Sequence, residues 1–348
     1  MSTYGFSSSG GVADREIGER IAILRYLMIV GIVFLHVPPH IPVEAVGTGL
    51  FESIRAWVQH GVFRAAVPVL TTISGYLLFR GALDRDFPRL LRKKSHTLLL
   101  PLVVFNLPVA LAVMYLQSRG AGIHDFSHQL YPPTLAGWGD ALLGLRGIPV
   151  NPALHFLRDL YVLSLLSPIL GWLARRYPAS GLLGLLAVSW WNLDGGLVLR
   201  TSMLLNFYLG ALVVARDWDP RGLDRWRWPL LTGFLALSVL AVAFQDQLLY
   251  WLRLSAPLLV WPAAALFTGT RPGVFMMGQS PSSFFIYVCH APLLFGAWLL
   301  YRQLLAESLP YWLFWWVSAI LVIVALRQLH RLLSARLPTA SRQLLGGR

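Results

Sequence analysis

Apolar runs long enough to cross a lipid bilayer follow one another along almost the whole chain, with short polar segments between them. Runs that can cover about 30 Å of hydrocarbon define ten candidate helices. These helices lie near residues 20–38, 62–80, 97–117, 153–174, 180–194, 197–215, 229–245, 248–268, 282–302 and 311–333. The fifth run is short, and the pattern leaves its boundary with the sixth open. The sequence therefore predicts an all-α, polytopic membrane protein with a single bundle of about ten transmembrane helices.

Polar sequence is concentrated at the two ends and in one long connection. Residues 1–19 carry charges of both signs and lack the short apolar core of a signal peptide, so we expect a cytoplasmic tail there. A second cytoplasmic tail is expected at 336–348, which leaves 20–335 as the transmembrane domain. The connection 118–152 is longer than the roughly 15 residues usual for a structureless loop. We expect it to be a lid or an acceptor-binding loop on the outer side.

The composition agrees with a membrane protein. Of the 348 residues, 56% are hydrophobic and 13% are charged, whereas about a quarter of the residues of an average soluble domain are charged. The single cysteine, Cys289, excludes an intramolecular disulfide.

The net charge of +13 is compatible with binding to nucleic acid, but the placement of the basic residues argues against it. If the N-terminus is cytoplasmic, 20 of the 29 basic residues lie in inner segments and only three, Arg55, Arg119 and Arg146, lie in outer loops. This asymmetry follows the positive-inside rule. It predicts an inner-membrane protein with an even number of spans, both termini in the cytoplasm and no nucleic-acid partner.

Six arginines lie within the apolar runs: Arg25, Arg64, Arg158, Arg200, Arg253 and Arg302. Any one of them could extend its charge to the lipid headgroups along its apolar stem. Charged groups this deep in several helices are otherwise typical of a polar cavity inside a bundle. We expect those in the outer parts of their helices to converge, together with His36, on one cavity open to the outer side.

The first apolar run, RYLMIVGIVFLH, begins with Arg25 and ends with His36. Eleven residues at about 100° each place the two side chains within about 20° of the same helix face. A rise of about 1.5 Å per residue separates them by roughly 16 Å, which suits two ends of one elongated ligand. A permanent guanidinium charge suits a phosphate or carbonyl, and an imidazole suits proton transfer near neutral pH. The alternative is that Arg25 extends to the inner headgroups and His36 caps the helix end.

The spacing Arg-x10-His in this run is the most specific mark of the acyltransferase 3 family, and the chain resembles these integral membrane enzymes along nearly its whole length. RAAVPVLTTISGYLLF is similar to the family's second helix, and FPRLLRKKSHTLLLP to the basic segment before the third. HFLRDLYVLSLLSP and FFIYVCHAPLL are similar to two later family segments. The resemblance implies transfer of an acyl group, acetyl or succinyl, from acyl-CoA to a hydroxyl of a cell-surface or exported carbohydrate.

Acyl transfer to a hydroxyl needs a base, and His36 fits this role. We expect Arg25 to take part in catalysis and, with a cationic segment, to hold the CoA phosphates at the inner face. That segment contains Arg89, Arg92, Lys93 and Lys94, although Lys94 and Thr97 replace the paired arginines of the family. The candidates for substrate binding are Arg64, Arg158, Asp159, Arg200 and His290. The expected partners are therefore acyl-CoA, a carbohydrate acceptor and the lipid bilayer, without a metal.

Two further histidine motifs each have two interpretations. His155 and Asp159 lie four residues apart on one helix face and suit a base with its orienting carboxylate, but an ion pair of Asp159 with Arg158 is the alternative. His124 and His128 could bind a metal from one helical turn, although two histidines without a clear third ligand more often form a polar loop.

A transporter or flippase of a sugar or lipid-linked sugar is the alternative function, because it also needs about ten helices and charges inside the bundle. The chain shows no inverted repeat and no matching pair of Gly- or Pro-broken helices in two halves. The pattern therefore favours the enzyme.

Overall fold

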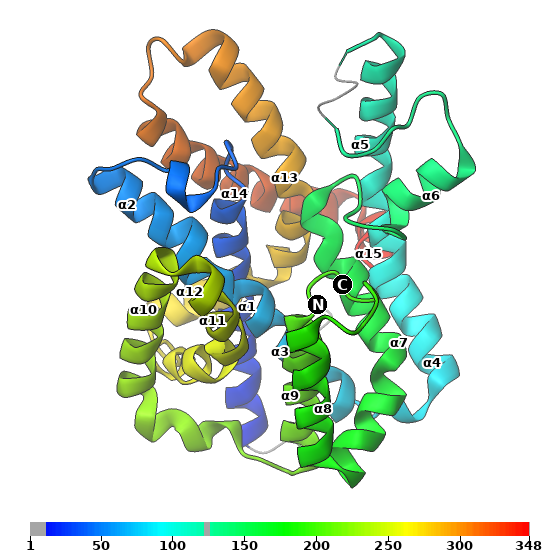
Figure 1. Cartoon of the computed structure of the whole chain (residues 1–348), viewed down its shortest axis with the longest axis vertical. Coiled ribbons are helices and arrows are strands. Elements are labelled where there is room, and N and C mark those ends of the chain that lie inside the picture. The colour runs from blue at the N-terminus through cyan, green and yellow to red at the C-terminus, as the bar shows by residue number, and fades with distance from the viewer. Residues whose placement is uncertain (1–11, 122–125, 348) are drawn as a thin grey trace.

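The computed structural model describes residues 12–121 and 126–347, and these residues form helices joined by turns and loops, without strands (Figure 1). The α-helices are α1 (Val12–Leu35), α2 (Leu50–Ala56), α3 (Ala66–Arg80), α4 (Phe87–Lys94), α5 (Leu100–Ser118), α6 (Leu135–Leu143), α7 (His155–Arg176), α8 (Pro178–Trp191), α9 (Ser202–Ala215), α10 (Arg227–Ala243), α11 (Gln245–Val260), α12 (Arg271–Gln279), α13 (Ser283–Leu300), α14 (Tyr311–Arg336) and α15 (Pro338–Leu344). Short 3-10 or π-helical segments lie between them: η1 (Val43–Ala45), η2 (Trp57–Gly61), η3 (Val62–Ala65), η4 (Leu83–Arg85), η5 (Ser95–Leu99), η6 (Pro152–Leu154), η7 (Pro220–Trp226), η8 (Trp261–Leu266), η9 (Ser280–Ser282) and η10 (Tyr301–Leu305).

Each of the ten predicted apolar runs overlaps one of these helices. Within the described residues, seven helical stretches are long and apolar enough to cross a membrane by length and composition, and α8 and α9 are apolar but shorter. The prediction of an all-α polytopic membrane protein is therefore confirmed. The number of ten spans, and the division into a transmembrane domain with two tails, stay predictions.

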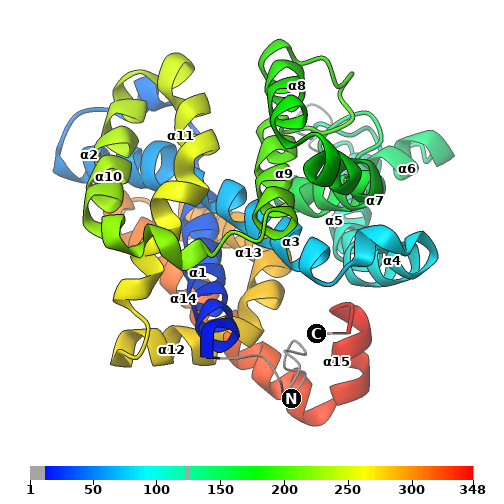
Figure 2. The same cartoon turned by 90° about the horizontal axis from the view of Figure 1, so that it is seen from below.

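Helix α1 lies in the middle of the molecule. Seen from below, it stands between the α10–α11 pair and the α3–α9 pair (Figure 2). It also packs on α12 and α13. Because its apolar side chains meet protein on several sides, residues such as Leu24 and Val33 are fully buried. Because α1 is central, a polar residue at the end of this helix lies inside the protein.

The tightest helix pair is α3 and α9, which approach through glycines. A Cβ atom on Gly75 would lie 2.4 Å from the carbonyl oxygen of Phe207, and one on Gly210 would lie 2.5 Å from the carbonyl oxygen of Thr72. Small residues permit such backbone contact between membrane helices. The side chain of Thr72 uses the short distance to donate a hydrogen bond to the carbonyl of Asn206 (3.0 Å).

Residues 126–152, the described part of the predicted long connection after α5, fold back onto α5. Helix α6 of this segment packs on α5 around a small apolar cluster that includes Val113 and Ala141. Gln117 donates to the carbonyl of His128 (2.8 Å) and accepts from the amide of Leu130 (2.7 Å). Buried amide side chains therefore anchor this connection to the end of α5, and its expected role as a lid or acceptor-binding loop stays a prediction.

The segment between α1 and α3 contains helices that the hydrophobic pattern does not predict. Helix α2 and η2 extend the second apolar run towards the N-terminus, and Arg55, expected in an outer loop, is buried. Its guanidinium donates to the carbonyl of Pro39 (2.7 Å) and to the side chain of Gln59 (3.0 Å). It also lies over the ring of Tyr311, 5.0 Å from the centroid. Arg55 thus fixes the turn that follows α1.

Candidate active site

His36 follows the last residue of α1 and faces the interior of the molecule. Its amide donates to the carbonyl of Val33 (3.1 Å), which tightens the last turn, and the segment VPPH that follows cannot continue the helix. The ring atom Nδ1 lies 2.8 Å from the carbonyl oxygen of Ile32. A carbonyl can only accept, so Nδ1 carries the proton and Nε2 of the neutral ring keeps its lone pair. His36 therefore caps the end of α1 through Nδ1, as the alternative interpretation expected, and its Nε2 is still available as a base.

A second histidine, His290 of α13, lies against His36. The two ring centroids are 4.9 Å apart. His290 is fully buried; its Nδ1 donates to the carbonyl of Tyr287 (2.7 Å), and its Nε2 has no hydrogen-bond partner among the described residues. The hydroxyl of Tyr287 in turn donates to the carbonyl of Ala153 (2.6 Å), which fixes α13 against η6. The two helices therefore bring two neutral imidazoles together, each with an Nε2 that can accept a proton.

His155, the first residue of α7, lies within electrostatic range of His36. Its Nδ1 donates to the carbonyl of Pro152 (2.8 Å). Asp159 does not bond to it. The carboxylate of Asp159 instead accepts from the side chain of Arg158 (3.0 Å) and from the backbone amides of Leu199 and Arg200 (both 3.1 Å). Asp159 therefore pairs with Arg158, which was the alternative interpretation, and it also holds the segment before α9 on α7.

Three arginines lie on neighbouring elements: the half-buried Arg64 in η3, the exposed Arg200 before α9, and the half-buried Arg253 in α11. Helix α11 packs on η3 and on α9, so the three arginines lie on adjoining elements. Arg64 and Arg253 both lie within electrostatic range of Arg200, and Arg253 also lies within range of Arg64. His155 interacts with Arg200 and Arg253 in the same way. We call these three residues the arginine cluster.

The irregular helix before α3 positions Arg64. Gly61 ends the π-helical segment η2, and a Cβ atom on it would lie 2.5 Å from the carbonyl oxygen of Ser238 in α10. The close approach of α10 thus requires glycine here. Arg64 follows within the next turn, with its Nη2 3.4 Å from Nδ1 of His60.

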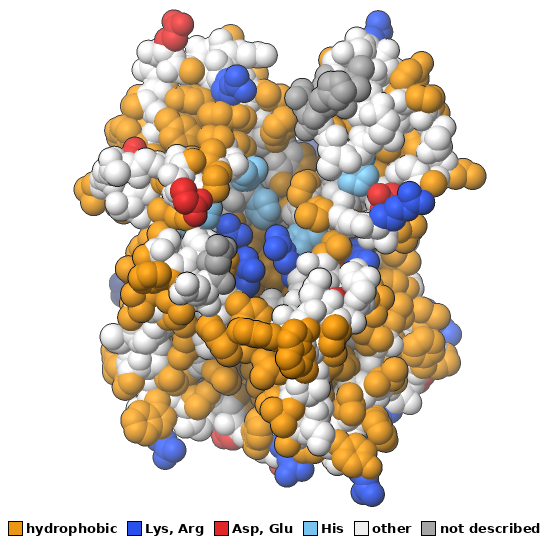
Figure 3. Space-filling view, in the orientation of Figure 1, with side chains coloured by type: hydrophobic (Ala, Val, Ile, Leu, Met, Phe, Trp, Pro, Cys, Tyr) orange, Lys and Arg blue, Asp and Glu red, His pale blue; other side chains and the backbone are white. Residues whose placement is uncertain are grey.

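The molecular surface has a hollow on the face shown in Figure 3. Histidines and basic side chains gather in it, over the region in which α1, α7 and α13 meet (Figure 3). The acidic side chains visible on this face lie at the rim of the hollow rather than within it (Figure 3). The hollow thus presents a positively charged surface beside the two imidazoles.

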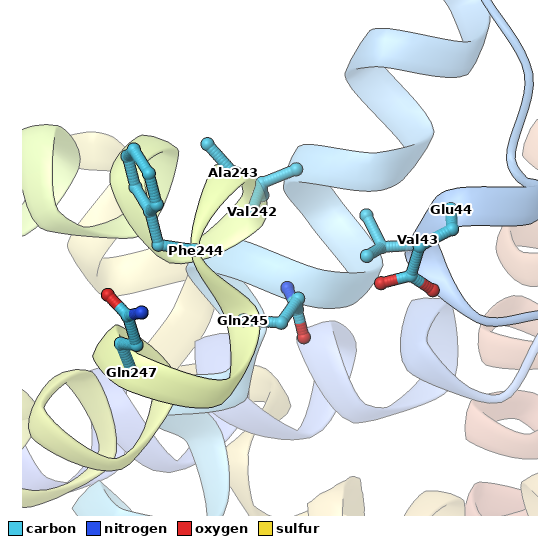
Figure 4. A pocket seen from close by; sticks show the side chains of 7 residues that line it. All are labelled: Val43, Glu44, Val242, Ala243, Phe244, Gln245 and Gln247. Carbon is cyan, nitrogen blue, oxygen red and sulfur yellow. The ribbon is translucent and has the colours of Figure 1, made fainter.

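A pocket of about 400 Å³ opens near the hollow, between η1 and the turn from α10 to α11 (Figure 4). It is lined by Val43, Glu44, Val242, Ala243, Phe244, Gln245 and Gln247. Gln245 donates to the backbone carbonyl of His60 (3.3 Å), the residue whose side chain contacts Arg64. The pocket is thereby connected to the arginine cluster through one residue, and it combines amide, carboxylate and aromatic groups.

The remaining predicted residues lie elsewhere. Arg25 is half-buried on α1, eleven residues before His36, or roughly 16 Å along the axis. The cationic residues of α4 lie after α3, and Arg89, Arg92 and Lys93 are exposed. The structure thus pairs His36 with His290 and places Arg64 and Arg200 on neighbouring elements, while Arg25 and the exposed cations of α4 lie away from His36.

Arg158 also lies outside the arginine cluster, because its guanidinium is used within the fold. It donates to Asp159 and to the carbonyls of Gly144 (3.1 Å) and Leu197. For the predicted histidine pair, His124 lies outside the described residues, and His128 has its Nε2 3.8 Å from a carboxylate oxygen of Asp140. Among the described residues, no group of three side chains is arranged to hold a metal.

Two groups are absent from the predicted list of binding residues. Arg253 was expected to face the outer polar cavity with the other arginines of the apolar runs, but it was not named as a substrate-binding candidate. A second group lies where α12 and α14 meet: Gln279 accepts from Arg327 (3.4 Å) and from Arg331 (3.3 Å). It lies near the Arg25 end of α1, because Tyr26 packs on Phe275 of α12 with ring centroids 6.3 Å apart.

The sequence is similar to known proteins along nearly its whole length. A sequence model of the acyltransferase domain that defines the acyltransferase 3 family matches residues 19–326. The chain is 32% identical over 349 residues to the succinoglycan biosynthesis protein ExoH of Rhizobium meliloti (strain 1021), covering 96% of this chain and 94% of that protein. No solved structure matches the chain. The protein therefore belongs to the acyltransferase 3 family and is a membrane-embedded acyltransferase.

Proposed function

We propose that the protein transfers an acyl group, acetyl or succinyl, from acyl-CoA to a hydroxyl of a cell-surface or exported carbohydrate. The observation that carries this proposal is the pairing of His36 with His290 beside a hollow, since His36 keeps a free Nε2 there. The name of its relative, a succinoglycan biosynthesis protein, favours a carbohydrate acceptor. Membership of an acyltransferase family argues against the alternative of a transporter or flippase.

In the proposed reaction, Nε2 of His36 takes the proton of the acceptor hydroxyl as its oxygen attacks the thioester carbonyl carbon. The new C–O bond forms, the C–S bond breaks, and the imidazolium returns the proton to the CoA sulfur, so that an ester and free CoA leave. A positioned base of this kind contributes about 10²- to 10⁴-fold. The negative charge that develops on the carbonyl oxygen is stabilised by the positive surface of the hollow.

The donor is proposed to enter from the opposite side of the membrane. CoA carries phosphates, and the cations near the other end of α1 suit them. These cations are Arg25 and the residues of α4, Arg89, Arg92, Lys93 and Lys94, and the pair Arg327 and Arg331 adds to them. The distance of roughly 16 Å between Arg25 and His36 lets an extended pantetheine arm join the two sites. This arrangement corresponds to an inner-membrane enzyme with both termini in the cytoplasm.

The acceptor is proposed to bind at the hollow and to extend into the pocket beside η1. Glu44 and Gln247 offer hydrogen-bonding groups for sugar hydroxyls, and the exposed ring of Phe244 offers an apolar face. This binding mode would place one hydroxyl near His36 while neighbouring sugar units contact the pocket.

The proposal is tested by mass spectrometry of exported and surface carbohydrates from cells with the intact protein, without it, and with His36→Ala. Acyl esters should be present only with the intact protein, while the variant is still found in the membrane at normal amount. Carbohydrate acylation that is unchanged in cells lacking the protein would contradict the proposed function.

A further inference from the structure

The arginine cluster has no acidic partner. Among the described residues, no ion pair includes Arg64, Arg200 or Arg253. The Nε of Arg64 is buried without a hydrogen-bond partner among the described residues, and its Nη2 lies 3.4 Å from Nδ1 of His60. The nearby carboxylate of Asp159 is already bonded to Arg158 and to two backbone amides.

The two arginines that are buried among the described residues have oxygen acceptors. Arg20 forms ion pairs with Glu16 and Asp224, and Arg55 donates to backbone and amide oxygens. The half-buried Arg158 pairs with Asp159. The arginine cluster differs from Arg20 and Arg158 because no carboxylate of the described residues forms an ion pair with it.

Three like charges close together in a partly desolvated site repel one another, and this repulsion lowers the stability of the empty site. An anion placed between them removes the repulsion and gains charge-assisted hydrogen bonds. The planar, forked guanidinium suits carboxylates in particular, because it can donate two parallel hydrogen bonds.

We propose that the arginine cluster binds a carboxylate of one of the two substrates, beside the histidine pair. This inference rests on the proposed acyl transfer and specifies its substrate class. The carboxylate has two possible sources, the far end of a dicarboxylic acyl group or an acidic sugar of the acceptor. The CoA phosphates are a poor match, because the proposed function places them at the other end of α1.

The experiment uses the full-length protein in lipid nanodiscs and measures kcat/KM for thioester cleavage. Acetyl-CoA is compared with succinyl-CoA, each with a neutral glucose oligosaccharide and with one that contains glucuronate. The variants are Arg64→Gln, Arg200→Gln and Arg253→Gln. Arg146→Gln serves as the matched control, because it removes the same charge from an exposed arginine of the segment after α6.

The expected result is a preference of roughly tenfold or more for a carboxylate-bearing substrate, which the three cluster variants lose and the control keeps. A preference for succinyl-CoA assigns the carboxylate to the donor. A preference for the glucuronate acceptor with equal use of both donors assigns it to the acceptor. No preference for either, or a preference that survives in all three variants, overturns the inference.

A binding measurement makes this test independent of catalysis. Free succinate and glucuronate should raise the unfolding temperature of the wild-type protein, whereas glucose and succinamide should not, and each cluster variant should lose this response. Without any anion, the cluster variants should unfold at or above the wild-type temperature, because a repulsive charge is removed. An unfolding temperature that does not respond to either acid contradicts the inference. The proposed function is judged separately, by whether thioester cleavage requires His36.

Discussion

The imidazole rings of His36 and His290 lie with their centroids 4.9 Å apart and their planes at 71°. Each ring uses Nδ1 to bond a backbone carbonyl of its own helix, Ile32 in α1 and Tyr287 in α13. Both rings are thereby held in the tautomer that leaves Nε2 free to accept a proton. The two histidines are 254 positions apart in the sequence, so their contact forms only when the helix bundle is assembled.

The first prediction concerns His290 as a positioning residue. We expect His290→Gln to lower kcat of acyl transfer by about 10- to 100-fold, as is usual for a partner that orients a reacting group. The KM for acyl-CoA should stay near the wild-type value, because His290 lies far from the proposed phosphate site. Steady-state kinetics with the purified variant check this split between kcat and KM. Cys289→Ala, one position away on α13, is the control and should leave both parameters unchanged.

The second prediction concerns the ion pair of the half-buried Arg158 with the buried Asp159. Asp159→Ala leaves two backbone amides without their acceptor and removes the counter-charge of Arg158, and the loss of a pair with a buried partner typically costs about 3–5 kcal/mol. We therefore expect a clearly lower unfolding temperature in detergent. Asp219→Ala breaks an exposed ion pair with Arg221 and should cost no more than about 1 kcal/mol. Equal losses in the two variants would show that Asp159 does not hold the segment before α9.

The third prediction concerns the contact between α3 and α9. Gly210→Ala places a methyl group 2.5 Å from backbone atoms of Thr72 and Tyr76, so the helices must separate. Overpacking of this kind costs about 1–3 kcal/mol, and the unfolding temperature should fall. In α10, Gly233 has open space around the position of a Cβ atom, and Gly233→Ala should be neutral or stabilising by up to about 1 kcal/mol. A destabilised Gly233→Ala with an unaffected Gly210→Ala would contradict the close approach.

The fourth prediction concerns the pocket beside η1. If it binds the acceptor, the double substitution of Glu44→Ala and Gln247→Ala should raise the KM for the carbohydrate several-fold, because two hydrogen-bonding groups are lost. The KM for acyl-CoA should not change. Glu307→Ala, an exposed acidic residue after η10, provides the control. An unaltered acceptor KM in the double variant would exclude the pocket from acceptor binding.

Much of the helical architecture could be predicted because membrane-spanning helices leave a local signal. Each apolar run must satisfy its own backbone in lipid, so length and hydropathy are enough to locate it. The placement of Arg55 and the folding of 126–152 onto α5 could not be predicted in this way. Arg55 is buried by contacts with Pro39 and Tyr311, and the connection is anchored by Gln117, so both depend on tertiary contacts that no local pattern encodes.

The candidate site was accessible to the sequence only in part. The spacing of Arg25 and His36, and charges inside apolar runs, indicated a polar cavity. The order of the helices around α1 decides which of those charged side chains lie together. Hydrophobic periodicity does not encode that order. Arg158 and Arg200 look equivalent in sequence, yet the structure uses the guanidinium of Arg158 within the fold and leaves that of Arg200 beside Arg64 and Arg253.

The measurement that tests the central claim most directly is acyl transfer from labelled acyl-CoA by the purified protein, comparing His36→Ala with His40→Ala. The two histidines are neighbours, with ring centroids 6.1 Å apart, but only His36 is paired with His290. If His36 is the base, its replacement should lower kcat by about 10²- to 10⁴-fold, while His40→Ala works at close to the wild-type rate and both variants unfold near the wild-type temperature. A correctly folded His36→Ala protein that transfers acyl groups at the wild-type rate would contradict the account.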